Sequence, residues 1–223
     1  MHESTNNLTA PSESEVRQRI LKSAEDFFAR KGFDATSIRD ITSAAECNVA
    51  AVNYHFGSKE KLYQEVFRQH FDVLRDSRIA SIRKVMSEAG ENLTLETLLQ
   101  AFAVAFLDPF LDRSTGKTLV HMFLRELSDP RLPANQFSDE VMIPVHTVLS
   151  ESISRVCPEL DARDSQKCIH SLIGQLVHFV QVHDYFSRIE NLDGKPMIHL
   201  NEMIQHAVQF TAAGIRSYME NDR

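Results

Sequence analysis

Residues that could recognise another molecule cluster near the N-terminus, in the stretch NVAAVNYHF over residues 48–56. Asn can form a bidentate pair with adenine, and Tyr and His can donate hydrogen bonds to phosphate oxygens or stack on bases. Asn53, Tyr54 and His55 end a predicted helix of only about two turns, which is marginal by itself and buries little. The polar members of this set therefore indicate recognition of DNA rather than core packing.

Helix starts beside this stretch supply candidate phosphate sites. Ser58 is a predicted cap for a helix that begins with Lys59, and the free N–H groups of a helix N-terminus bind anions. The charge of Lys59 adds to that attraction. Thr36 and Ser37 precede another helix and can act in the same way.

The elements that would position these residues form a helix-turn-helix. A helix over 13–31 is followed by a second that starts after Thr36 or Ser37, and by a third from Val49 to Phe56, capped by Asn48 and ended by Gly57. In this geometry the last of the three enters the major groove. Apolar residues four apart, Val52 and Phe56, can both face inward, so residues 53–55 point elsewhere.

The remaining sequence predicts helices only, so the fold class is all-α: a three-helix head with a helix-turn-helix and a larger C-terminal helical domain. Long segments lack Gly and Pro, of which the chain has 7 each. We expect helices over 59–86, 94–107, 116–127, 137–156, 162–189 and 199–220, with a hinge at 87–93. Pro144 should kink or break the helix that contains it, because it removes a backbone hydrogen bond.

Composition limits the classes of protein that remain. The net charge of the chain is −7, yet residues 1–83 hold 12 Lys and Arg against 12 Asp and Glu. The head is therefore balanced, and a DNA contact must come from a local patch. The sequence contains no run of 18 apolar residues, so it predicts no membrane span. The three cysteines, Cys47, Cys157 and Cys168, follow no CxxC pattern and fit a reducing cytoplasm. Residues 1–12 do not resemble a secretory signal and read as a disordered arm.

At this point the sequence resembles the TetR family of bacterial transcription regulators. TSIRDITSAAECNVAAVNYHFGSKEKLY, residues 36–63, is similar to the family's DNA-binding signature, and GFDATSI, residues 32–38, to its link between the first two helices. The resemblance implies a DNA-binding domain over 13–60 and a ligand-binding and dimerisation domain over 61–223. The DNA-contacting residues that it implies are Thr36, Ser37, Arg39, Asn48, Val49, Ala50, Asn53, Tyr54, His55 and Lys59.

Two departures from the family pattern matter. Glu46 stands where the family usually has Gly, which predicts backbone strain or a different turn. Val49 and Ala50 offer methyl groups where polar residues are common, which suggests thymine methyl contacts or weak base readout. Alternatives also stay open: Tyr54 could pack between helices, His55 and Lys59 could be ordinary surface residues, and Arg39 could form a salt bridge.

The C-terminal half carries weaker signals. LVHMFLREL, PRLP and EVMIPVHTVLSESISRV are similar to a TetR subgroup called CerR-like. The resemblance implies a cavity for a small-molecule effector, which we expect to be apolar or amphipathic. Plain core packing is the alternative for each candidate lining residue. These candidates are Phe67, Phe71, Phe102, Phe106, His121, Arg125, Gln175, His178 and Phe179.

The last two long helices indicate a homodimer. Their apolar positions leave almost no polar face on 162–189, so a second copy would cover what one subunit cannot, in a two-fold four-helix bundle. Gly174 would allow close approach. A helix buried wholly within one subunit is the alternative.

The sequence thus predicts a ligand-responsive repressor that binds a palindromic operator in double-stranded DNA as a dimer and that is released by an effector. It predicts no enzyme, no catalytic residue, no metal site and no cofactor, because the histidines show neither HxxxH spacing within one helix nor HExxH. The rivals are a helical adaptor that binds a protein and a metal-binding enzyme that keeps the fold.

Overall fold

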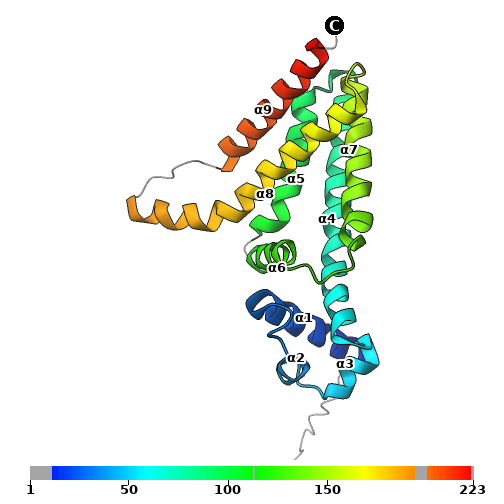
Figure 1. The fold of residues 1–223 in the computed structure, drawn as a ribbon, viewed down its shortest axis with the longest axis vertical. Coiled ribbons are helices and arrows are strands. Elements are labelled where there is room, and N and C mark those ends of the chain that lie inside the picture. Colours follow the sequence, from blue (N-terminus) through cyan, green and yellow to red (C-terminus); the bar gives the residue numbers. More distant parts are fainter. Residues whose placement is uncertain (1–11, 113, 194–199, 222–223) are drawn as a thin grey trace, which may run out of the picture. The chain divides into compact units, whose positions relative to one another are not determined.

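The structure, a computed structural model, describes residues 12–112, 114–193 and 200–221, and the side chains of these residues except those of 183–193 and 221 (Figure 1). Every regular element within these ranges is a helix, which confirms the all-α fold class. The arm expected over residues 1–12 lies outside the described residues except for Ser12. Ser12 caps the first helix by accepting a hydrogen bond from the backbone N–H of Glu15.

The chain divides into two compact units, residues 1–68 and 69–223. The first unit contains α1 (Glu13–Lys31), α2 (Ile38–Ala44), α3 (Val49–Phe56) and the beginning of α4 (Lys59–Ala89). Side-chain caps fix where these short helices begin, and Gly32 and Gly57 end α1 and α3 with φ of 80° and 83°. An L side chain rarely adopts such a φ, so glycine is the suitable residue at both ends.

Aromatic packing joins the beginning of α4 to the rest of the first unit. Tyr63 meets Phe28 edge-on with ring centroids 4.9 Å apart, and Phe33 at 5.1 Å. Phe67 packs on Tyr63 at 5.0 Å and is fully buried. The first unit therefore continues to Arg68, past residue 60, where the sequence placed a domain boundary.

The second unit contains the remainder of α4, a short 3-10 turn (Gly90–Asn92), and the helices α5 (Leu95–Leu111), α6 (Gly116–Ser128), α7 (Ile143–Val156), α8 (Ala162–Asp193) and α9 (Leu200–Asn221). Helix α5 packs against α6, α7, α8 and α9, and α8 lies along α9 (Figure 1). None of the described helices is long and apolar enough to span a membrane. The core of the unit is apolar and includes Leu99, Phe102, Leu149, Ile153, Leu172, Leu176, Ala207 and Ile215.

Pro144 interrupts its helix, as predicted. A π-helical segment over Ser138–Met142 precedes α7, and Pro144 lies in the first turn of α7. Proline has no N–H to donate into the preceding turn, so it is well suited to the start of a helix.

Helix α8 differs from the expectation that it is apolar nearly all round. Ile169, Leu172 and Leu176 are buried, whereas His170 and His178 on the same helix are exposed. Polar residues between the apolar positions thus form a solvent-exposed face, which the number of apolar residues in the helix did not reveal.

Candidate nucleic-acid interface

The short helix α3 has one anchored face and one exposed face. Val52 is fully buried and Phe56 is 8% exposed, so the two residues fix the helix on the first unit. Asn53 is exposed and Tyr54 is 73% exposed. The polar tip of α3 is therefore held by apolar neighbours while its side chains stay available to another molecule.

The N-terminal end of α3 presents small and polar groups. The Oδ1 atom of Asn48 accepts a hydrogen bond of 2.9 Å from the backbone N–H of Ala51, which leaves the side-chain amide of Asn48 as a donor. Val49 is 45% exposed and Ala50 is also exposed. Methyl groups and one amide donor thus lie where a recognition helix meets base edges.

Tyr54 is a surface residue, so the alternative that it packs between helices is wrong. Its hydroxyl donates only a long hydrogen bond, 3.4 Å, to Oε1 of Glu13. Its ring meets the half-buried His55 edge-on, with centroids 5.0 Å apart. The two rings orient each other and leave the phenol largely in solvent.

The two candidates before α2 differ from each other. Thr36 is 1% exposed, and its hydroxyl is within hydrogen-bond distance of the carbonyls of Gly32, at 2.7 Å, and Phe27, at 3.3 Å. This burial argues against a DNA contact by Thr36 and explains how the link between α1 and α2 is held. Ser37 is exposed and forms a capping box with Asp40.

Arg39 is a solvent-exposed cation in the first turn of α2. It forms no ion pair with any residue that the structure describes. The neighbouring carboxylate of Asp40 lies 3.8 Å from Nζ of Lys31 instead. Hydrogen bonds from the backbone and side chain of Ser37 lower the pKa of Asp40, so this carboxylate remains ionised and engaged at the helix start.

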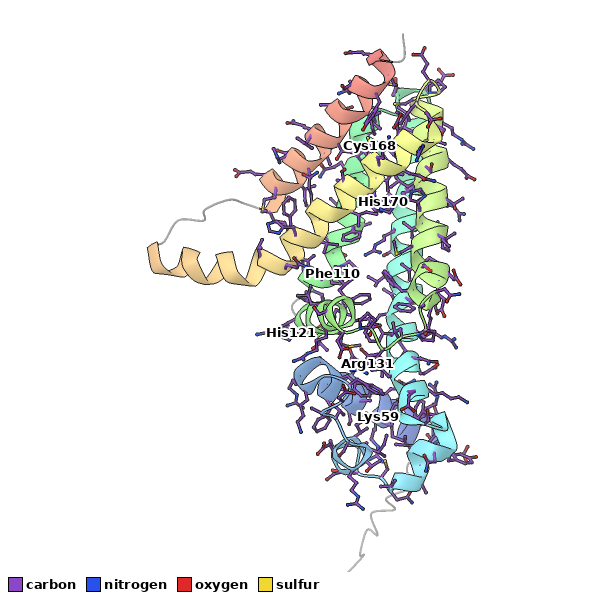
Figure 2. The ribbon with its side chains drawn as sticks, in the orientation of Figure 1. Lys59, Phe110, His121, Arg131, Cys168 and His170 are labelled. Atoms are coloured by element: carbon purple, nitrogen blue, oxygen red, sulfur yellow. The ribbon has the colours of Figure 1, made fainter. Side chains whose placement is uncertain are left out.

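Lys59 is held in place at the beginning of α4 (Figure 2). Its Nζ atom lies over the ring of Phe33, 4.3 Å from the centroid. Oγ of Ser58 accepts a hydrogen bond from the backbone N–H of Lys61 and caps the helix. A cation fixed on an aromatic ring at a helix N-terminus is a suitable anion contact, because both the charge and the helix dipole attract phosphate.

The turn between α2 and α3 carries the predicted strain. Glu46 has φ of 51°, the positive value that the family's usual Gly would adopt without cost. The Glu46 carboxylate lies 3.7 Å from Nη1 of Arg19 but is largely in solvent, so this ion pair offsets little of the strain.

The residues expected to line an effector cavity do not all come together. Phe71, Phe102, Phe106 and Phe179 are buried in the second unit. Phe67 belongs to the packed interior of the first unit. Three of the remaining candidates have exposed side chains: His121 (Figure 2), Arg125 and His178. Gln175 is half-buried, and its side-chain amide donates a hydrogen bond to the carbonyl of Ser171 on the same helix.

Aromatic residues cluster around a buried arginine that was not among the predicted site residues. Arg78 is 4% exposed, and its guanidinium lies over the ring of Phe106, 4.1 Å from the centroid. Phe110, Phe123 and Phe137 continue the cluster. The signal was present in the sequence, since Arg78 follows Leu74 by four residues and so falls on the apolar stripe of α4.

No group of three or more His, Cys, Asp or Glu side chains that could hold a metal ion occurs in the part of the chain that the structure describes. The paired histidine rings of that part, His146 and His170, lie 6.0 Å apart. Burial and the nearby His170 lower the pKa of His146, so both factors favour its neutral form.

An anchored helix with a polar exposed tip, after a turn and a capped helix, defines the class of helix-turn-helix transcriptional regulators. Family models agree with this class along most of the chain. Residues 20–66 match "Bacterial regulatory proteins, tetR family", and residues 95–215 match the C-terminal domain of the HTH-type transcriptional dual regulator CecR. The protein is a TetR-family transcriptional regulator with a C-terminal domain of the CecR type. The name of the subgroup is CecR, not CerR.

Curated relatives share only part of their length with this chain. The probable HTH-type transcriptional regulator YttP of Bacillus subtilis is 23% identical over 113 residues, which is 51% of each protein. The negative transcriptional regulator IcaR of the biofilm operon icaADBC in Staphylococcus aureus is 27% identical over 85 residues, 38% of this chain and 42% of IcaR. The chain thus spans about half the length of the curated relatives it matches, or less.

Solved structures share the fold over most of the chain. A putative TetR-family regulator from Mesorhizobium loti has a TM-score of 0.62 at 18% identity, covering 94% of this chain and 99% of that one. A putative transcriptional regulator from Saccharomonospora viridis in complex with choline has a TM-score of 0.59 at 19% identity, covering 88% and 95%. At these identities the likeness shows the fold alone.

Proposed function

We propose that the protein represses transcription by binding, as a dimer, a palindromic operator from which a small-molecule effector releases it. The observation that carries this proposal is the exposed polar tip of α3, with Asn53 and Tyr54 in solvent above the buried Val52 and Phe56. Anchoring by the two apolar residues fixes the direction of these side chains and leaves the Tyr54 ring 73% exposed. Base edges and phosphates of DNA offer partners for both side chains.

The proposed contacts fall into two groups. Base edges in the major groove are read from the exposed side of α3, by Asn48, Val49, Ala50, Asn53, Tyr54 and His55. Phosphates are bound by Ser37 and Arg39 at α2 and by Lys59 at α4. Thr36, whose hydroxyl faces the carbonyl groups of the α1–α2 link, positions α2 rather than touching DNA.

The proposed dimer pairs the exposed sides of α8 and α9. Ile173 and Val177 of α8 are half-buried, Gly174 has no atom within 4 Å of the place a Cβ would take, and Phe210 of α9 is 62% exposed. A second copy would cover these apolar groups in a two-fold, self-complementary contact. The two heads would then meet half-sites about 34–36 Å apart or somewhat wider.

Light scattering behind size-exclusion chromatography tests the dimer. We expect the wild type to elute with twice the chain mass of 25.4 kDa and Phe210→Glu to elute as a monomer. Leu127→Glu is the matched control, since Leu127 of α6 is 64% exposed and should tolerate a charge. A monomeric wild type, or dissociation by the Leu127 variant alone, would refute the proposed interface.

Relatives support the direction of regulation and the presence of an effector. IcaR is named as a negative regulator, and the regulator from Saccharomonospora viridis carries choline, so this fold hosts a small molecule. The apolar second unit of the present chain, with its aromatic cluster, suits an apolar or amphipathic effector. Such an effector would act by binding one of two arrangements of the dimer more tightly than the other.

Selection of bound duplexes from a random pool tests operator recognition. We expect enriched sequences with two inverted half-sites, and an affinity that falls steeply with salt because phosphate contacts release counterions. A reporter gene placed behind the selected operator should be silenced by the protein in cells. Absence of any enriched or salt-dependent duplex would refute the proposal and favour the rival of a protein-binding adaptor.

A further inference from the structure

The second unit contains a buried cation that lacks an anionic partner. Arg78 of α4 is 4% exposed, and none of the described carboxylates pairs with it. Its Nη2 atom donates to the carbonyl oxygen of Phe106 at 3.5 Å, the limit of a hydrogen bond, and its Nε atom is buried without a partner. A guanidinium has five N–H donors, so most of its hydrogen-bonding capacity is not used by the protein.

Such an arrangement is costly unless something else uses it. Buried charges in proteins are paired or hydrogen-bonded, because desolvation of an unpaired ion is unfavourable. Burial lowers the pKa of Arg78 to about 9, which still leaves the side chain charged at neutral pH. The Phe106 ring offsets part of the cost through a cation–π contact but provides no hydrogen-bond acceptor for Nε.

The surroundings of Arg78 are aromatic. From Phe106, successive ring contacts lead to Phe110 at 6.2 Å, then to Phe123 at 5.7 Å and Phe137 at 5.6 Å. Phe106 is buried and the other three rings are half-buried. Phe123 and Phe137 also pack on the fully buried Phe71, so the rings form one aromatic cluster with Arg78 at its Phe106 side.

We propose that Arg78 binds the carboxylate of an effector whose apolar, ring-bearing body packs against Phe106, Phe110, Phe123 and Phe137. Carboxylates accept paired hydrogen bonds from a guanidinium, and the low-polarity surroundings strengthen each of them. This inference rests on the proposed function, because it names the chemical class of the effector. It assigns binding to one charged residue and one aromatic cluster.

Calorimetry with arylalkanoates tests the class of ligand without any mutation. The probes are 4-phenylbutyrate and 2-naphthylacetate, each compared with its uncharged primary amide of nearly the same shape. We expect each acid to bind the dimer about 10- to 100-fold more tightly than its amide, the effect of hydrogen bonds to a charged group. Equal affinity of acid and amide, or no binding of either acid, would overturn the proposal.

Two variants then test the residue. Arg78→Met keeps an apolar side chain of similar length and should bring the acid down to the affinity of its amide, with the affinity of the amide unchanged. Arg83→Met is the matched control, since Arg83 lies exposed on the same helix, and its acid-over-amide preference should stay that of the wild type. Equal loss of acid and amide in Arg78→Met would indicate a structural role and refute the proposal.

Operator affinity measured without any ligand distinguishes a failure of the Arg78 site from a failure of the proposed repressor function. A protein that binds the selected operator but shows no acid preference refutes the Arg78 site alone. A protein that prefers the acids but binds no operator refutes the proposed repressor and leaves the Arg78 site supported. We expect the wild type to bind the operator and to prefer the acids over the amides. The acids should release the operator from the wild type but not from Arg78→Met.

Discussion

The two compact units place their unpaired polar groups in opposite environments. In the first unit, Asn53 and Arg39 are exposed while apolar residues anchor the helices that carry them. In the second unit, Arg78 is buried among phenylalanines. The first arrangement suits a large partner that docks on a surface, and the second suits a small one that must leave water. The contrast is what we expect if the chain, as proposed, recognises two partners by different physical means.

The units also differ in what holds them together. Short helices in the first unit depend on side-chain caps and on one aromatic contact zone around Tyr63. Long helices in the second unit share one extended apolar core around Phe102 and Leu172. Loss of a core ring should therefore harm the second unit more than any surface change harms the first.

The largest expected effect comes from Phe102→Ala. Phe102 is 1% exposed, and removal of a buried ring costs about 3–5 kcal/mol of unfolding free energy. Val104→Ala on the same helix is the control, because Val104 is 46% exposed and should change that free energy by only about 0.5 kcal/mol. Denaturant unfolding followed by circular dichroism measures both. Equal effects of the two changes would contradict the core assignment.

A smaller loss is expected from the tip of α3. Asn53→Ala and Tyr54→Ala should each weaken operator binding by about 1–3 kcal/mol and relax the preferred sequence at one position of each half-site. Fluorescence anisotropy with the selected operator and its single-base variants measures this. Asn92→Ala, an exposed asparagine of the second unit, is the control and should leave affinity unchanged. Unchanged affinity and preference in both α3 variants would end the assignment of α3 as the recognition helix.

Much of the first unit could be predicted from the sequence because its signals are local. Caps and terminal glycines mark helix ends within a few residues, so α1 and α3 begin and end where expected. Glu46 at a glycine position predicted backbone strain or a different turn, and Glu46 has a positive φ of 51°. Thr36 shows the limit of such signals, because a threonine hydroxyl can either cap a helix or face inward. The packing of the link between α1 and α2, where the hydroxyl faces the carbonyl of Gly32, determines which of the two occurs.

The site in the second unit could not be predicted in the same way. Phe71, Phe102 and Phe106, which were expected to line a cavity or to pack in the core, are buried, whereas His121 and His178 are exposed. Which of these candidates is buried depends on how neighbouring helices pack. Arg78 was overlooked because its charge suggested the surface. Its position on the apolar stripe of α4 was the better signal, since periodicity reflects packing whatever the residue type.

A change in salt dependence should distinguish the phosphate contacts from the base contacts. Lys59→Ala should weaken binding about equally for all sequences and reduce the slope of log affinity against log salt by about 1. Affinities at several salt concentrations measure this slope, and Lys84→Ala, an exposed lysine later in α4, is the control. A variant that alters sequence preference while keeping the wild-type slope would place Lys59 at a base rather than at a phosphate.

The smallest expected effect is a gain in stability at the turn before α3. A non-glycine residue at positive φ costs about 1–2 kcal/mol, and glycine recovers this at an entropic cost of about 0.5–1 kcal/mol. Glu46→Gly should therefore stabilise the first unit by about 0.5–1 kcal/mol in calorimetric unfolding. Glu46→Ala separates the causes, because it removes the contact with Arg19 but keeps the Cβ at φ of 51°. Stabilisation by alanine as well would attribute the gain to the lost carboxylate, and stabilisation by glycine alone would attribute it to the backbone.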